Sequence, residues 1–501
     1  MSPAGPAAPR KVKKVVLVVI DGLTPSELDR AVAGGRAPVL GELMARGEYV
    51  GSCAAAFPSV TPVCSASIAT GRLQDDHHVP SMNWYSRAEG RYVEYGSSFA
   101  ASRRFGIAQQ LTDTVYNLNA EHLNPDTPTV FERLDDAGVR TAGTTYLMYR
   151  GRHRHEPSAE FPLTRLVGTT LLRRTVDGPK ELFYADLYAS RRTGCWSQMG
   201  TPGMRDQHSG CVAAHMVERD LFDFLLLSLP DNDTASHTGG VEAQVAAIHA
   251  ADRQLERVMH AGGGIDTFLD DHAVVVMADH AHAQVDHAIE LGAAFEDWAV
   301  RAPRRRAATR DAEVALCPSQ RAAMVYALVE EGRARTVPRL VAAAREVEGV
   351  DLVLWREEGR GVIASQRGEL RFAPAEGRGR ALADPRGARW ALRGELGVLE
   401  ARVQDGVLRS DAYPDALARA WAALACPTSG DVLLSAAPGW EFPDWGGIWH
   451  DGGGSHGSLH ASDTLGSLVV CGLDLPAERV RDDTWSIRDI APMIAAHFGA
   501  G

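Results

Sequence analysis

The distribution of apolar residues along the chain predicts a buried parallel sheet. Three runs are rich in apolar and β-branched residues, as is typical of strands covered on both faces. They are residues 15–20, 221–229 and 272–277. Apolar residues also recur at helical spacing over residues 28–46, 241–260 and 487–498. The alternation of strand and helix patterns predicts an α/β fold whose sheet is mostly parallel and flanked by helices.

The pattern changes near residue 300. From there to about 430, short strand patterns and two helical patterns stand among many glycine and charged residues. We interpret residues 301–429 as an inserted small α/β lobe. Strand character returns at 430–435, so the sequence predicts a catalytic core made of residues 12–300 and 430–501.

Composition and charge narrow the classes of protein to consider. The chain has 501 residues, 45% of them hydrophobic, and a formal net charge of −12. This fraction of hydrophobic residues is typical of a globular protein, and the negative net charge disfavours a nucleic-acid polymer as partner. The apolar run at 15–20 is too short for a signal peptide or a membrane span, which predicts a cytoplasmic protein without a membrane partner. Seven scattered cysteines without CxxC spacing argue against a disulfide framework or a cysteine zinc site.

Residues 57–71 have the features of an anion site. Thr61 is predicted to be a helix N-cap, Pro62 follows at the first helical position, and Gly71 stands where a left-handed stop is expected. The Thr61 hydroxyl, a potential nucleophile, would then lie at the positive end of a helix dipole. Most Thr-Pro pairs only cap helices, so the stretch gains meaning from acidic and histidine residues elsewhere.

Acidic and histidine side chains follow the predicted strands. The residues concerned are Asp21, Asp233, His237, Asp279, His280 and His456. Because the carboxyl ends of parallel strands meet at one edge of a sheet, we expect these side chains to converge. Each residue taken alone could equally be a turn Asp or a loop His. Together with the Thr61 hydroxyl they suit two divalent ions with nitrogen and oxygen ligands, zinc first and manganese second.

At this point the sequence resembles the alkaline phosphatase superfamily, and within it the nucleotide pyrophosphatase/phosphodiesterase branch. In that branch a Phe-Pro-x-x-Thr segment carries a nucleophilic Thr, and a Thr-Gly pair ends the helix ten residues later. Phe57-Pro58-Ser59-Val60-Thr61 and Thr70-Gly71 match both type and spacing. The resemblance covers roughly residues 12–300 and 430–501, and it implies an alkaline-phosphatase-like core.

The resemblance also implies a site. One metal would be held by Asp233, His237 and His456. The other would be held by Asp21, Thr61, Asp279 and His280. Thr61 would attack phosphorus to give a phosphothreonine intermediate, which water then hydrolyses. Asn83 matches the family's loop Asn, which holds a phosphoryl oxygen, and Tyr85 is a further candidate for contact with the substrate.

The sequence departs from the family's pattern at several positions. The family's His lies four residues after a Pro-Asp pair, but Ala235 lies four residues after Asp231, which moves the metal-binding pair to Asp233 and His237. An Ala replaces the Gly after the Asp-His pair. Residues 62–64 differ from the family's segment that follows the nucleophile, so the sequence does not predict which residues would contact a nucleotide. His460 is the alternative to His456 as the late ligand.

Three functions are compatible with these residues. The first is a two-metal hydrolase that cleaves a phosphodiester or pyrophosphate bond of a small, nucleotide-like substrate; the neutral Asn83 favours a diester. The second is a phosphomonoesterase or a C–P hydrolase like phosphonoacetate hydrolase. The basic loop at Arg150–Arg154 is compatible with this function. The third is a non-catalytic, metal-stabilised binding protein. The oligomeric state is not predicted.

Overall fold

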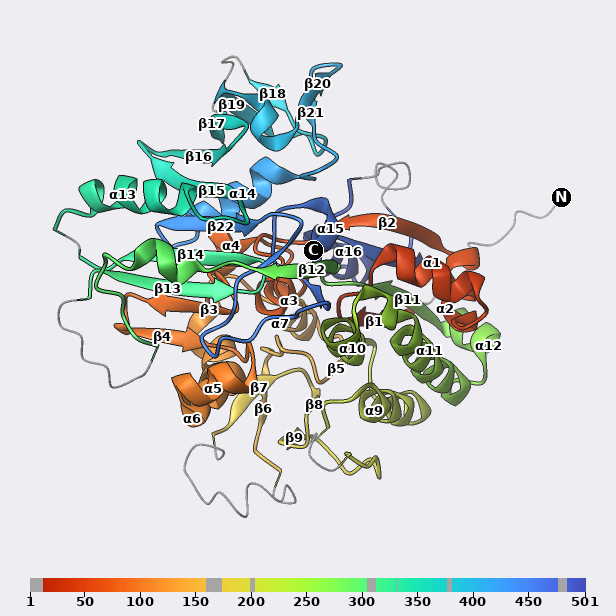
Figure 1. The fold of residues 1–501 in the computed structure, drawn as a ribbon. Helices are drawn as coiled ribbons and strands as arrows, with labels where there is room; N and C mark the ends of the chain where they lie inside the picture. The colour runs from red at the N-terminus through yellow and green to blue at the C-terminus, as the bar shows by residue number, and fades with distance from the viewer. Residues whose placement is uncertain are drawn as a thin grey trace.

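A computed structural model describes residues 12–158, 174–198, 203–303, 312–329, 331–375, 381–475 and 484–501. Two large sheets dominate this part of the chain. Figure 1 shows the sheet that contains β1, β10 and β11 on one side of the molecule and the strands from β15 to β21 on another.

The first sheet has eight strands in the order β2-β25-β11-β1-β10-β5-β8-β9. Neighbours from β11 to β8 run parallel, whereas β25, β2 and β9 pair antiparallel. The strands are β1 (Lys14–Ile20), β2 (Glu48–Ala54), β5 (Thr141–Thr144), β8 (Glu181–Tyr184), β9 (Tyr188–Ala189), β10 (Phe224–Leu229), β11 (His272–Met277) and β25 (Leu465–Cys471). The three apolar runs are therefore adjacent strands, and the predicted, mostly parallel sheet is confirmed.

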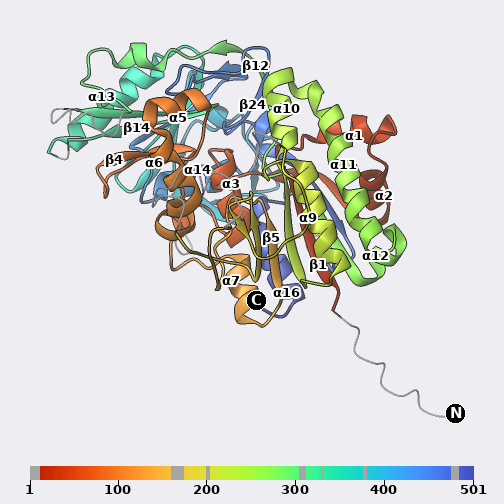
Figure 2. The ribbon, with the colours of Figure 1, turned by 90° about the horizontal axis from the view of Figure 1, so that it is seen from below.

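Helices cover both faces of this sheet. Alternate residues of β1 point to opposite sides: Val16 and Val18 belong to one apolar cluster, Val15 and Leu17 to another. The first cluster packs against α1 (Pro25–Ala33), α2 (Pro38–Arg46), α9 (Asp206–Glu218), α11 (Gln244–Ala261) and α12 (Ile265–Asp271). The second packs against α3 (Thr61–Thr70), α7 (Val130–Asp136) and α16 (Ile490–His497). Figure 2 shows the sheet between these two helical layers.

The second sheet has ten strands in the order β13-β14-β22-β15-β16-β17-β19-β18-β21-β20. Its strands are β13 (Val314–Ser319), β14 (Ala322–Ala327), β15 (Val350–Glu357), β16 (Arg360–Ser365), β17 (Gly368–Pro374), β18 (Leu382–Ala383), β19 (Arg389–Gly394), β20 (Arg402–Gln404), β21 (Val407–Arg409) and β22 (Val432–Ala436). With it lie α13 (Arg333–Arg345) and α14 (Ala416–Ala425). The strand expected to return to the core, β22, pairs with β14 and β15 within this second sheet.

Smaller elements surround the ends of the core strands. They include α10 (Asp231–Gly239), the three-stranded sheet of β12 (Ala283–Ala288), β23 (Gly439–Glu441) and β24 (Gly454–Ser455), and the hairpin of β3 (Asn83–Ser86) and β4 (Arg91–Glu94). Others are α4 (Gln74–His77), α5 (Phe99–Phe105), α6 (Ile107–Thr112), a π-helix (Asp113–His122), β6 (His153–His155), β7 (Val176–Gly178), α15 (Ala461–Thr464) and 3₁₀ turns at Val241–Ala243, Leu291–Phe295, Leu396–Leu399 and Ile487–Asp489.

Cys195 and Cys211 form a disulfide, which the scattered cysteine spacing did not predict. Cys211 lies on α9 and Cys195 in the segment before it, so folding brings together two residues 16 apart that share no sequence motif. The other five cysteines, all within the described residues, are buried and form no disulfide. Among the described residues, no helix is both long and apolar enough to cross a membrane.

Candidate metal centre and nucleophile

Three adjacent strands of the core sheet deliver the predicted acidic residues to one edge. Asp21 follows β1, and its backbone N–H donates to the Leu229 carbonyl at the end of β10. Asp233 lies in the first turn of α10, which follows β10. Asp279 and His280 follow β11. Neighbouring parallel strands thus end together, and residues far apart in the chain become neighbours.

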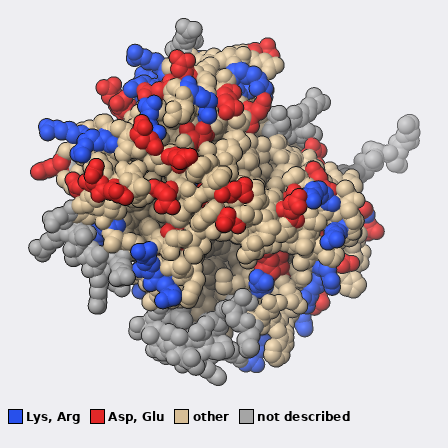
Figure 3. All heavy atoms as spheres, viewed as in Figure 1, with Lys and Arg blue, Asp and Glu red and all other residues tan. Residues whose placement is uncertain are grey.

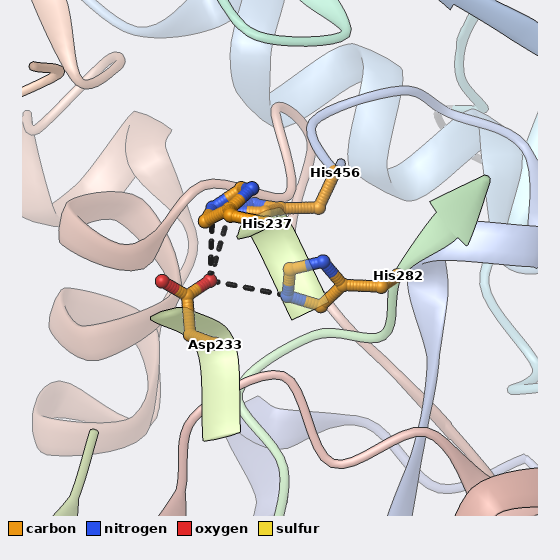
Figure 4. A group of neighbouring side chains, drawn as sticks. All are labelled: Asp233, His237, His282 and His456. Carbon is orange, nitrogen blue, oxygen red and sulfur yellow. Dashed lines mark hydrogen bonds and ion pairs between the residues drawn. The ribbon is translucent and has the colours of Figure 1, made fainter. Parts of the chain in front are cut away.

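A first group consists of one carboxylate and three imidazoles, which we call the Asp233 group: Asp233, His237, His282 and His456. Asp233 Oδ1 lies 3.1 Å from Nε2 of His237, 3.1 Å from Nε2 of His282 and 3.4 Å from Nε2 of His456. Figure 4 shows the three rings, which come from different parts of the chain, converging on this oxygen. One ligand atom from each residue lies within 4.8 Å of the others, as one cation would require.

Two of the three rings are held in the form that binds metals. His237 Nδ1 lies 2.8 Å from the Gly454 carbonyl, and His456 Nδ1 lies 2.7 Å from the Ser59 carbonyl. A carbonyl oxygen only accepts, so each Nδ1 carries the donated proton and a neutral ring keeps the lone pair at Nε2. The Nε2 atoms that face Asp233 are therefore available as ligands.

His282 is a member that the sequence analysis missed. It stands immediately before β12, and its buried ring lies close to Gly22 and Gly454. A Cβ at Gly22, whose φ is +66°, would collide with this ring. The signal in the sequence is its position two residues after His280, a predicted ligand.

A second group is richer in oxygen, and we call it the Asp21 group: Asp21, Thr61, Asp279 and His280. His280 Nε2 lies 3.5 Å from Asp21 Oδ1, 3.4 Å from Asp279 Oδ2 and 3.4 Å from Thr61 Oγ1. Asp279 Oδ1 accepts from the backbone N–H groups of Gly22 and His280, both at 3.0 Å. The rings of His280 and His456 stack with centroids 3.6 Å apart, so the two groups adjoin.

Burial and charge perturb these groups in opposite directions. Burial raises the pKa of Asp21 well above its ordinary value, and the charges of Asp279 and Asp233 raise it further. Burial likewise raises the pKa of Asp279 to about 6. Burial alone would raise the pKa of Asp233 too, but the surrounding imidazoles hold it well below the ordinary value. Burial lowers the pKa of His282 to about 4 and that of His280 well below its usual range.

These features fit divalent cations. Asp21 Oδ1 is buried without a hydrogen-bond partner, a costly state for a carboxylate oxygen. Among the described residues, no Lys or Arg forms an ion pair with a member of either group, so the crowded carboxylates lack a protein cation. Neutral imidazoles and carboxylates are the donors that zinc prefers, and manganese accepts the oxygen-rich set as well.

Thr61 begins α3 but does not cap it. The N-cap position belongs to Val60, and no side chain makes a capping hydrogen bond there, so the predicted N-cap role is wrong. The hydroxyl instead faces His280 in the Asp21 group. Gly71, with a φ of +70°, ends the helix in the left-handed conformation as predicted. A threonine that does not cap its helix has its oxygen free for chemistry.

Other predicted site residues lie elsewhere. Asn83 is fully buried, and its amide group donates to the Pro318 carbonyl and to Ser97 Oγ. Tyr85 is buried against the rings of Tyr92 and Tyr326. Neither side chain hydrogen-bonds to a member of either group within the part of the chain that the structure describes. Their roles in substrate binding stay predictions.

The alternative late ligand and the basic loop have protein partners. His460 Nδ1 lies 3.0 Å from Ser462 Oγ, whereas His456 faces Asp233. In the basic loop, Arg150 and Arg152 both pair with the buried Glu132 of α7. These arginines are thus used in holding the loop to the core.

Comparisons with known proteins identify the family of the chain. A model of the family described as type I phosphodiesterase/nucleotide pyrophosphatase matches residues 15–459. The chain belongs to this family. The predicted resemblance is thereby confirmed, and so is the expectation that the protein is a phosphoric ester hydrolase, from a family that typically depends on divalent metals. A search of curated proteins gives no match.

Solved structures show the same fold at low sequence identity. Phosphonoacetate hydrolase from Sinorhizobium meliloti 1021 in complex with phosphonoformate is 18% identical, with a TM-score of 0.55 over 98% of this chain and 97% of that one. Human ectonucleotide pyrophosphatase/phosphodiesterase 5 is 12% identical, with a TM-score of 0.54 over 97% and 95%. An inactive murine form of the latter, in complex with AMP, is 11% identical, with a TM-score of 0.55 over the same shares.

Proposed function

We propose that this family member is a two-metal phosphodiesterase that cleaves a phosphodiester or pyrophosphate bond of a small, nucleotide-like substrate. The observation that carries the proposal is the Thr61 hydroxyl, which lies 3.4 Å from His280 Nε2 where the two groups adjoin. The Asp233 group and the Asp21 group would each hold one divalent ion, with zinc the first choice. When bound, two such ions neutralise charge on the phosphoryl oxygens and lower the pKa of a nearby hydroxyl.

The side chains supply the rest of the chemistry. The Thr61 hydroxyl gives its proton to the leaving oxygen or to water, and Oγ forms a bond to phosphorus while the bond to the leaving oxygen breaks. This gives a free alcohol or phosphate and a phosphothreonine that still carries the other ester group of the substrate. Water then cleaves the phosphothreonine and restores the hydroxyl. Thr61 lies at the amino-terminal end of α3, so the positive end of the helix dipole would lie beside a phosphoryl group bound there.

Charge favours a diester over a monoester. The described residues place no Lys or Arg in an ion pair with either group. Without such a cation the site suits the single negative charge of a diester better than the additional charge of a monoester. On the face shown in Figure 3, basic side chains are interspersed with acidic ones rather than gathered in one patch. This distribution and the net charge of −12 support a small substrate over a nucleic-acid polymer.

A phosphonate substrate is the second candidate. The similar structure of phosphonoacetate hydrolase, which covers 98% of this chain, supports it. We expect faster turnover of bis-p-nitrophenyl phosphate than of p-nitrophenyl phosphate or phosphonoacetate, and loss of all turnover with a chelator. Preference for the monoester or the phosphonate would support the second candidate. No turnover of any phosphoryl substrate would leave a metal-stabilised binding protein.

Replacing Thr61 tests the nucleophile. We expect Thr61→Ala to lower kcat at least about a thousandfold, because no other hydroxyl replaces the attacking oxygen, and Thr61→Ser to keep part of the activity. Rapid quenching of the wild-type reaction with bis-p-nitrophenyl phosphate, followed by mass spectrometry, should find one p-nitrophenyl phosphoryl group on the peptide that contains Thr61. Full activity of Thr61→Ala would contradict the proposal.

A further inference from the structure

The inserted lobe reaches the Asp233 group through one hairpin. Strands β13 and β14 are joined by Gln320 and Arg321, and Gln320 has a φ of +58°. Few residues other than glycine adopt this left-handed conformation, and such residues gather at functional sites. The hairpin tip is therefore a candidate part of the site.

Hydrogen bonds fix the tip to the loop that carries His456. The Arg321 backbone N–H donates to the His456 carbonyl at 2.9 Å, and the Phe442 N–H donates to the Gln320 carbonyl at 2.7 Å. The Arg321 guanidinium is fully buried and lies 2.8 Å from the carboxylate of Asp463. These hydrogen bonds consequently fix the Gln320 backbone close to His456, a member of the Asp233 group.

The Gln320 carboxamide points at the same group. Its Nε2 lies 3.3 Å from His237 Nε2, and its Oε1 is buried with no hydrogen-bond partner. His237 donates through Nδ1 to Gly454, so in the neutral form of the ring Nε2 carries a lone pair that can accept from the Gln320 amide. The Nε2 lone pair of His237 is also the one that a cation would use, and it serves only one partner at a time.

We propose that Gln320 is a substrate-binding residue. With a cation on His237, the Gln320 amide loses its present partner and donates instead to a phosphoryl oxygen of the ester at the Asp233 group. This inference rests on the proposed function and adds a specificity determinant to it. A neutral donor suits the single charge of a phosphodiester, and it comes from the lobe rather than from the core sheet.

The test compares Gln320→Met, which keeps the length but removes the hydrogen bond, with Gln320→Glu, which replaces the donor by a negative charge. The matched control is Gln404→Ala, at an exposed position on β20 of the same lobe. Each zinc-loaded variant is assayed with bis-p-nitrophenyl phosphate. Inorganic phosphate binding is measured by calorimetry, and metal content by atomic absorption.

We expect Gln320→Met to lower kcat/KM about 10- to 100-fold and to weaken phosphate binding about tenfold, with unchanged metal content and unfolding midpoint. Gln320→Glu should weaken phosphate binding further, and Gln404→Ala should match the wild type. The inference is overturned if Gln320→Met retains kcat/KM and phosphate affinity, or if its losses follow loss of metal. Absence of turnover by the wild type would instead overturn the proposed function.

Discussion

The Asp233 group and the Asp21 group lie side by side but balance charge differently. In the Asp233 group one carboxylate is surrounded by three imidazoles, and its pKa lies well below the ordinary value. In the Asp21 group the buried Asp279 and the partly buried Asp21 adjoin one imidazole, and the pKa values of both carboxyl groups are raised. The first group is stabilised by its own members, whereas the second has unbalanced negative charge that a cation would relieve. The Thr61 hydroxyl belongs to the second.

Removal of a ligand from the histidine-rich Asp233 group should distinguish the two groups most clearly. We expect His282→Ala to weaken zinc binding at one of two sites about 10- to 100-fold and to leave the other site unchanged, because the Asp21 group does not use this ring. Calorimetric zinc titration would measure both sites. His287→Ala, at an exposed position on β12, is the matched control. Equal weakening at both sites would show that the groups are not separate.

Amide replacements should shift metal-free stability in opposite directions. Asp233→Asn removes the charge that three imidazoles contact, so we expect the free energy of unfolding to fall by about 1–3 kcal/mol. Asp21→Asn removes a buried charge that lacks a counter-ion, so we expect a rise of roughly 1–2 kcal/mol. Urea unfolding at pH 7.5 with a chelator measures both. Shifts of the same sign would contradict the contrast between the groups.

Glu94 is a buried carboxylate outside both groups, and burial is the largest cause of its raised pKa. Glu94 lies in β4, away from both groups, and burial raises its pKa from 4.5 to about 7 although Ser97 and Gly96 donate to it. Because the folded state holds this proton more tightly than the unfolded chain, the free energy of unfolding falls as pH rises from about 4.5 to about 7.

Glu94→Gln should abolish that fall. We expect the variant to match the wild type at pH 4.5 and to exceed it by roughly 1–2 kcal/mol at pH 8, measured by urea unfolding at both pH values. Glu121→Gln, at an exposed position, serves as the control. A constant difference at both pH values would mean that Glu94 is ionised in the folded protein throughout this range.

The sequence predicts the core sheet and the acidic residues at its edge, because both depend on local patterns. Apolar runs identify β1, β10 and β11, and the residues that follow each run must end at one edge once those strands are parallel neighbours. The histidines found by spacing, His237 and His280, follow from the same patterns.

Contacts between distant elements could not be predicted in this way. The place of His282 depends on the space left by Gly22 and Gly454, and that of Gln320 on how a lobe hairpin meets the His456 loop. Asn83 shows the opposite case, because its residue type suits a phosphoryl contact but its amide already donates to other partners. These partners are Ser97 Oγ and the Pro318 carbonyl. Strand β22 likewise pairs with β14 and β15 of the second sheet, and the sequence of β22 alone does not reveal these partners.

Anomalous diffraction from zinc-loaded crystals would locate both proposed metal ions. We expect two zinc peaks: one within about 2.0–2.2 Å of ligand atoms of the Asp233 group, and one at the same distances from Asp21, Asp279 and His280 beside the Thr61 hydroxyl. A single peak, or peaks away from these side chains in fully active crystals, would contradict the two-metal proposal.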